Sequence, residues 1–389
     1  MVHFVSDSHE MEKHLRKIHD LVCANGSFVH EDIVICSQNG SLTIEAPARV
    51  VEQQKLMMLP DEALLPLEKF ELVLNGDDIC IESNTDFVSP VQVQLMEEML
   101  ALYNLNGKIA EHKRSATHSL YHLDRELLAH VADEKLIASM AQWNDKNFYI
   151  EAFMASRRLG RKLKGDPTKK QSVLMPLIDF FNHHPQAYSF GDDDGRLMTR
   201  MFTTPETGRE CFVRYGKLDD HHVFLSYGYP ETKSPMVESH SMEIDVPGFG
   251  TIQIHKRPAA PHNLKNIPRQ QKGLEPFLSP IAINEDRTRL TIGCVWIPPK
   301  GAPRALRRVL GMYFERMKSD MSFGQMSAFV DEAEHQIIDN NCKYYSELKV
   351  KLESHIAKPG AEQILENAKI MVDSQLRKIT AYSFDASRS

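Results

Sequence analysis

Two short segments carry the residue types best suited to chemistry. In LMPLIDFFNHHPQAYSF an apolar run leads to Asn182 and His183, and FVRYGKLDDHHVFLSYGYPE contains Tyr215 and Tyr227. The apolar run predicts that Asn182 and His183 lie in a buried site, where polar side chains need hydrogen-bond partners. Phenol rings would give that site walls that are apolar and compatible with a cation. Together the four residues predict a reaction pocket.

The pairing resembles the SET-domain methyltransferases, in the branch typified by the Rubisco large-subunit lysine methyltransferases. That branch has an Asn-His pair and, further along, a Tyr-Gly-Phe or Tyr-Gly-Tyr; here Asn182 and Tyr227 lie 45 positions apart. A Tyr-Gly, a polar turn and a short helix lie between them, as in VRYGKLDDHHVFLSYGY. The resemblance implies an S-adenosyl-L-methionine-dependent protein N-methyltransferase that acts on a lysine of a non-histone protein.

The resemblance also assigns roles to particular residues. Tyr227 would be the catalytic tyrosine, at the point where donor and acceptor meet, and Tyr215 would line the same acceptor channel. Tyr229 would pack at the cofactor side. The Asn182 side chain and the His183 backbone would bind the amino-acid and adenine portions of the cofactor.

The cofactor pocket would be completed by a first hairpin and by an arginine. The family's hairpin carries Gly-x-Gly, and the nearest match here is Asn39, Gly40 and Ser41, with Asn and Ser at the outer glycine positions. Asn adopts the left-handed region at modest cost, whereas Ser does so less easily. The resemblance implies that Arg157 binds the carboxylate of the cofactor, because the arginine side chain presents two parallel N–H donors to a carboxylate.

Arg158 and Arg161 are alternatives to Arg157. All three begin the one basic run, RRLGRKLKGDPTKK. This run is interpreted either as a solvated helix end that continues into a loop or as a surface that binds the cofactor carboxylate and docks the substrate.

The predicted fold is α+β. A SET-type β fold of small sheets is expected over residues 1–232, with a large helical insertion at about 61–170. Its expected elements are a helix over 11–22, strands over 32–37, 41–46 and 55–60, and a last insertion helix over 147–163. Asn39 and Gly40 between the first two strands are a hairpin signal.

Residues 233–389 are expected to form a mainly helical C-terminal domain. It begins with a β-rich segment, followed by a proline-interrupted linker from Arg257 to Gly273. Helical segments are predicted next from apolar stripes. The stripes cover 306–317, 326–337 and 345–356, and a last helix covers 361–382.

The chain is expected to be a cytoplasmic monomer. The 389 residues carry a net charge of −7, which argues against nucleic-acid and anionic-membrane partners, and no apolar run is long enough to cross a bilayer. The six cysteines lie far apart without a CxxC, so no disulfide framework and no metal cluster is expected. The expected partner is a protein that presents a lysine or a histidine.

Alternative functions depend on the histidines and on the altered hairpin. A Ser-His-Asp hydrolase lacks support because the Gly-x-Ser-x-Gly motif is absent. A metal site at His183, His184, His221 and His222 is disfavoured, because adjacent histidines on a strand point to opposite faces. A histidine methyltransferase, or a degenerate SET-fold protein that only binds partners, remains an alternative.

Overall fold

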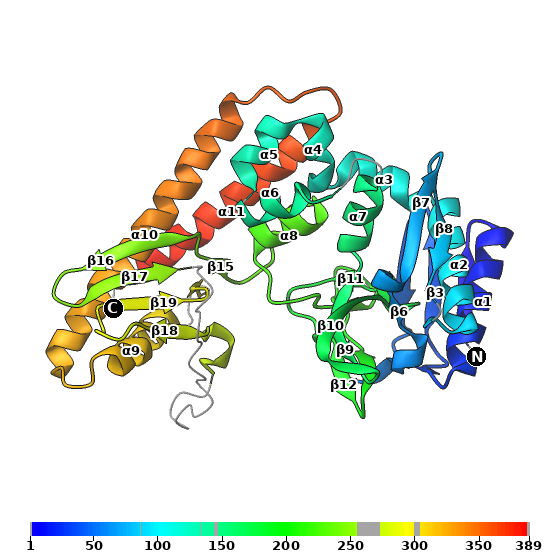
Figure 1. The fold of residues 1–389 in the computed structure, drawn as a ribbon, viewed down its shortest axis with the longest axis horizontal. Helices are drawn as coiled ribbons and strands as arrows, with labels where there is room; N and C mark the ends of the chain where they lie inside the picture. The colour runs from blue at the N-terminus through cyan, green and yellow to red at the C-terminus, as the bar shows by residue number, and fades with distance from the viewer. Residues whose placement is uncertain are drawn as a thin grey trace. The chain divides into compact units, whose positions relative to one another are not determined.

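The computed structural model describes residues 2–85, 87–132, 134–143, 147–254, 273–298 and 304–386. The chain divides into two units (Figure 1). Unit 1 comprises residues 1–217, 225–229 and 358–364, and unit 2 comprises 218–224, 230–357 and 365–389. Most of the predicted linker from Arg257 to Gly273 lies outside the described residues.

The first predicted helix and the first predicted hairpin of unit 1 both form. Helix α1 (His9–Ala24) begins at Ser8, whose side chain accepts hydrogen bonds from the first-turn N–H groups, and its apolar stripe is buried. Strands β3 (Val34–Gln38) and β4 (Ser41–Glu45) pair as a hairpin. Asn39 and Gly40 form its turn with φ of 51° and 73°.

Small sheets form the β part of unit 1. The strand orders are β1-β3-β4, β12-β13-β5-β2, β6-β10-β9, β7-β8 and β11-β14. The bounds not yet given are β1 (His3–Ser6), β2 (Phe28–Val29), β5 (Lys55–Leu59), β6 (Leu65–Pro66), β7 (Phe70–Asn75), β8 (Asp78–Asn84), β9 (Leu159–Leu163), β10 (Asp166–Leu174), β11 (Asn182–His183), β12 (Gly191–Asp193), β13 (Arg196–Arg200) and β14 (Phe212–Val213).

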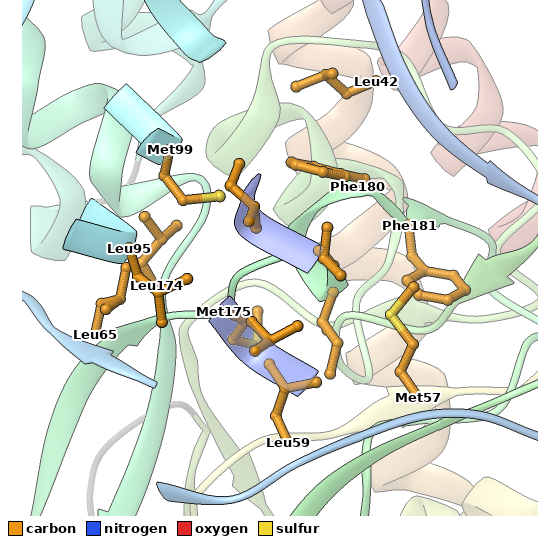
Figure 2. Close-up of a cluster of buried hydrophobic side chains, with 14 of the residues drawn as sticks. Leu42, Met57, Leu59, Leu65, Leu95, Met99, Leu174, Met175, Phe180 and Phe181 are labelled. Carbon is orange, nitrogen blue, oxygen red and sulfur yellow. The ribbon is translucent and has the colours of Figure 1, made fainter. Parts of the chain in front are cut away.

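The core of unit 1 forms around the apolar run that ends at Phe181. Figure 2 shows Leu174, Met175, Phe180 and Phe181 among side chains from α2 and β5, such as Met99. Phe180 and Phe181 are at most 1% exposed. This packing fixes the backbone immediately before Asn182, and burial of each large side chain contributes about 1.5–3 kcal/mol.

The predicted helical insertion at about 61–170 is only partly correct. Helices occupy its middle: α2 (Pro90–Leu105), α3 (Lys108–Ser115), α4 (Leu120–Leu123), α5 (Arg125–Val131), α6 (Glu134–Met140) and α7 (Phe148–Ala155). Strands β6, β7 and β8 precede them and β9 and β10 follow. Asn75 and Gly76 turn β7 into β8, a hairpin signal that the helical interpretation overlooked.

The helix predicted over 147–163 is wrong beyond Ala155. Helix α7 ends there, and Leu159–Leu163 forms strand β9, which pairs antiparallel with β10. The basic run is therefore a strand hairpin instead of a helix end. Pairing with β10 satisfies the backbone polar groups of β9, which outweighs a weak helical preference.

Unit 2 combines short strands with long helices. The sheet β16-β17-β19-β18 and the pair β15-β20 are formed by β15 (Val237–Glu238), β16 (Met242–Val246), β17 (Gly250–Ile254), β18 (Ile281–Ile283), β19 (Arg289–Ile292) and β20 (Trp296–Ile297). The helices are α9 (Ala305–Met317), α10 (Phe323–Ser354) and α11 (Glu362–Ala386). The α+β prediction is confirmed.

One helix carries two of the predicted stripes, except for Ile356, which lies beyond its end and is 90% exposed. The stripes over 326–337 and 345–356 were expected on separate helices, but α10 is continuous from Phe323 to Ser354. No glycine or proline interrupts the segment between them, so nothing ends the helix there. In the part of the chain that the structure describes, helices with the length and apolar character for a bilayer crossing are absent.

Candidate functional site

A cavity of about 400 Å³ opens in unit 1. Its walls come from the β3–β4 hairpin, α3, the end of α7, the segment around β11 and the residues around the end of α8 (Asp220–Tyr227). The lining residues are Ser41, Leu42, Lys108, Glu111, His112, Ser115, Ser156, Arg157, Asp179, Asn182, His183, Tyr215, Tyr227 and Tyr229. Seven of the predicted site residues are thus in one place: Ser41, Arg157, Asn182, His183, Tyr215, Tyr227 and Tyr229.

Asn182 and His183 form the short strand β11, which pairs in parallel with β14. The expectation of a fully buried pair is wrong for Asn182, which is exposed and donates from Nδ2 to Glu210 Oε1 at 2.6 Å. The core ends at Phe181, so its burial does not extend to the next side chain. His183 is half-buried, and its Nδ1 accepts the Tyr215 backbone N–H at 3.2 Å.

Three tyrosine rings gather at the cavity. The Tyr227 ring centroid lies 5.3 Å from that of Tyr215 and 6.0 Å from that of Tyr229. The Tyr215 hydroxyl donates to the Phe181 carbonyl at 2.6 Å. Burial, with the nearby charge of Asp179, raises the pKa of Tyr227, and burial is also the main cause that raises the pKa of Tyr215. Both phenols are therefore neutral near pH 7.

At Gly228 the backbone that follows α8 packs closely against the C-terminal end of α3. Its φ is +79°, and a Cβ there would lie 2.3 Å from the Ser115 carbonyl oxygen and 2.6 Å from Ala116 Cα. Only glycine permits both this conformation and this backbone approach. The contact therefore places Tyr227 and Tyr229, on either side of Gly228, next to the α3 wall.

A buried ion pair lies in the cavity wall. Arg157 Nη1 is 2.7 Å from Asp179 Oδ2, which also accepts the Tyr103 hydroxyl at 2.6 Å. The guanidinium carbon lies 4.5 Å from the centre of the Phe153 ring. Burial raises the pKa of Asp179 although the charge of Arg157 opposes it. Asp179 is an acidic residue in an apolar run, a signal of a paired charge that could have been recognised in the sequence.

The other predicted arginines and the hairpin turn lie differently. Arg161 pairs with Asp61 and Asp192 at 3.0 Å each, and it does not line the cavity. Arg158 is exposed. Asn39 and Gly40 form the exposed hairpin turn, while the neighbouring Ser41 reaches the cavity.

Helix α3 contributes a wall that the sequence analysis missed. Lys108, Glu111, His112 and Ser115 follow at i, i+3, i+4 and i+7 and all line the cavity. Burial lowers the pKa of His112 to about 3, so the imidazole is neutral near pH 7. A polar stripe on a short helix resembles any solvated face, so sequence alone gave no signal.

A smaller cavity of about 40 Å³ adjoins the first and shares Ser156, Arg157, Asp179, Tyr215 and Tyr227 with it. Its remaining walls are mostly apolar: Arg158, Leu159, Met175, Ile178 and Phe190. The arrangement combines a larger chamber with a smaller cavity, and the residues that line only the smaller one are mostly apolar. The tyrosines lie where the two share walls.

No family model matches the chain, and no curated protein matches it. Among solved structures, the chain is similar to Rubisco LSMT bound to AdoMet, with a TM-score of 0.47 and 10% identity over 96% of this chain and 92% of that one. It is also similar to the SET domain of LSMT bound to lysine and AdoHcy, with a TM-score of 0.43 and 10% identity over 97% and 92%. These likenesses assign no role to any residue of this chain.

Proposed function

We propose that this chain is a SET-type protein N-methyltransferase that uses S-adenosyl-L-methionine and acts on a lysine side chain of a non-histone protein. The observation that carries the proposal is the convergence of Tyr215, Tyr227 and Tyr229 with Asn182 and His183 around one cavity. Each of these residues belongs to a motif that is recognisable in the sequence. They occupy three separate segments, so their convergence is a tertiary property.

The cavity has the properties that this cofactor needs. Its volume of about 400 Å³ falls within the roughly 300–1,000 Å³ of small-molecule sites. Aromatic rings suit a sulfonium, and the cations Lys108 and Arg157 suit a carboxylate. Lys108 Nζ makes one hydrogen bond to the residues that the structure describes, so its ammonium group still has donors for a ligand.

When bound, the cofactor supplies an electrophilic methyl group. The protein's task is to align a neutral amine with that group and to exclude water. A tunnel with aromatic walls favours the neutral form of a lysine amine, because desolvation penalises the ammonium. The Tyr227 hydroxyl, kept protonated by its raised pKa, can orient the amine without adding charge.

The smaller cavity supports lysine as the acceptor. Leu159, Met175, Ile178 and Phe190 give it apolar walls that match the methylene chain of lysine.

Substitution of Tyr227 by Phe tests this mechanism. We expect the variant to fold and to bind S-adenosylhomocysteine as the wild type does, but to transfer methyl groups about 10²-fold more slowly. The assay measures the transfer of labelled methyl groups from S-adenosylmethionine to proteins of a cell extract. Hydrolysis of the labelled protein then identifies methyl-lysine or methyl-histidine.

Tyr188 provides the matched control. Its hydroxyl bonds to Glu52 and its ring does not line either cavity, so Tyr188→Phe should keep the full rate. Equal rates for the wild type and Tyr227→Phe would remove Tyr227 from catalysis. If the wild type binds neither S-adenosylmethionine nor its product at millimolar concentration, the proposed function is wrong.

A further inference from the structure

The first turn of α3 places two opposite charges in the cavity wall. Lys108 Nζ lies 2.8 Å from Glu111 Oε2, and both residues line the cavity. The Lys108 side chain is 15% exposed, whereas that of Glu111 is 55% exposed. An ammonium group has three donors, and Lys108 uses one on Glu111 without another hydrogen bond to the residues described. Lys108 can therefore bind an anionic ligand group.

Arg157 is less able to bind a carboxylate with two hydrogen bonds. Its Nη1 is engaged by Asp179, and its Nε is buried without solvent contact. A bidentate contact needs two adjacent N–H groups, either Nη1 with Nη2 or Nε with Nη2. The first pair lacks a free Nη1, and the second lacks an accessible Nε. The rings of Tyr103 and Phe153, 4.9 and 4.5 Å from the guanidinium carbon, hold Arg157 in this position. The pair Arg157–Asp179 is thus a built-in part of the wall.

The beginning of α3 also lies beside the β3–β4 hairpin. A Cβ on Gly40 would lie 3.8 Å from Asn106 Oδ1, and Asn106 Nδ2 donates to Ser37 Oγ at 3.0 Å. Lys108 follows Asn106 by two residues, and it is the first residue of a helix whose free N–H groups favour an anion. The hairpin and α3 therefore contribute to the same part of the wall.

We propose that Lys108 and Glu111 form a subsite for the zwitterionic group of an α-amino acid, with Lys108 binding the carboxylate and Glu111 the ammonium. The proposal rests on the proposed function, because the methionyl group of S-adenosylmethionine is such a zwitterion. A free amino acid has the same group. Ligand binding would exchange the Lys108–Glu111 pair for two ligand contacts, so neither charge would be left without a partner.

The test compares ligands with and without the amino-acid group by calorimetric titration. S-adenosylhomocysteine carries it, 5′-methylthioadenosine has the same nucleoside and sulfur without it, and free L-lysine has it without the nucleoside. We expect Lys108→Met to weaken S-adenosylhomocysteine binding about 10- to 100-fold, as for the loss of a charged hydrogen bond, and to leave 5′-methylthioadenosine within about twofold. Glu111→Gln should have a smaller effect in the same direction.

Two controls separate charge from structure. Lys108→Arg keeps the positive charge and should bind S-adenosylhomocysteine within about tenfold of the wild type. Lys113 lies on the same helix, pairs with Asp77 and does not line the cavity. Lys113→Met should therefore leave the affinity for all three ligands unchanged.

The outcomes separate this proposal from the proposed function. If the wild type binds both nucleosides and Lys108→Met weakens them equally or not at all, the subsite is overturned while the cofactor site stands. If the wild type binds neither nucleoside, the proposed function fails. If the wild type also fails to bind L-lysine, or binds it equally well after Lys108→Met, the proposed subsite is wrong as well. A selective loss of L-lysine alone would support the subsite and identify a free amino acid as its ligand.

Discussion

Removal of the Asp179 carboxylate should destabilise unit 1 by about 4 kcal/mol. Asp179 pairs with Arg157 and accepts the Tyr103 hydroxyl, and its side chain is 6% exposed. Asp179→Ala leaves the guanidinium unpaired, which costs about 3 kcal/mol at the low end of the known range because 19% of that side chain is exposed. The unpaired Tyr103 hydroxyl, fully buried, adds about 1 kcal/mol.

Urea denaturation followed by circular dichroism measures this loss. The double variant Arg157→Met with Asp179→Ala should be more stable than Asp179→Ala alone, since it leaves no unpaired charge. The resulting interaction energy should be at least about 2 kcal/mol. The exposed pair of Lys349 and Asp373, with side chains 43% and 57% exposed, is the control and should give less than about 1 kcal/mol. Additive losses at Arg157 and Asp179 would refute the reasoning.

Two further predictions concern the helix that carries Tyr227. Gly228→Ala should lower the free energy of unfolding by more than about 2 kcal/mol, through strain and backbone overlap. Gly160→Ala, whose Cβ would meet a single side-chain atom at 3.9 Å, should cost under about 1 kcal/mol; equal losses would contradict this account. Burial raises the pKa of Asp220 from 3.8 to about 6. Between these values the folded state binds more protons, so the contribution of Asp220 to stability should fall by about 2 kcal/mol as pH rises from 4 to 6. Denaturation series across this range should show a flatter profile for Asp220→Asn; an unchanged profile would contradict the assignment.

The sequence predicted those features that depend on neighbouring residues. Asn39 and Gly40 specify a turn through their tolerance of positive φ, and the apolar spacing after Ser8 specifies a buried helix face. Such signals act over a few positions, so they are independent of the rest of the fold. The motif residues Asn182 and Tyr227 were likewise recognisable from their types and spacing.

Elements that depend on a distant partner were harder to predict. Leu159–Leu163 is a strand because β10 pairs with it, although its own residues allowed a helix. Asn75 and Gly76 are an exception, because their turn signal was present in the sequence. A single continuous helix α10 could also have been predicted, because the segment between its two apolar stripes contains no glycine or proline.

The site itself was decided largely by tertiary structure. The sequence by itself determined which residues could do chemistry, because residue type and order are local properties. It did not determine that Arg157 is engaged by Asp179, that Asn182 is exposed, or that Lys108 lines the same cavity as the tyrosines. Each of these features depends on how segments far apart in the chain pack together. That packing buries some charged side chains and pairs them with partners, and it thereby decides which of them can still bind a ligand.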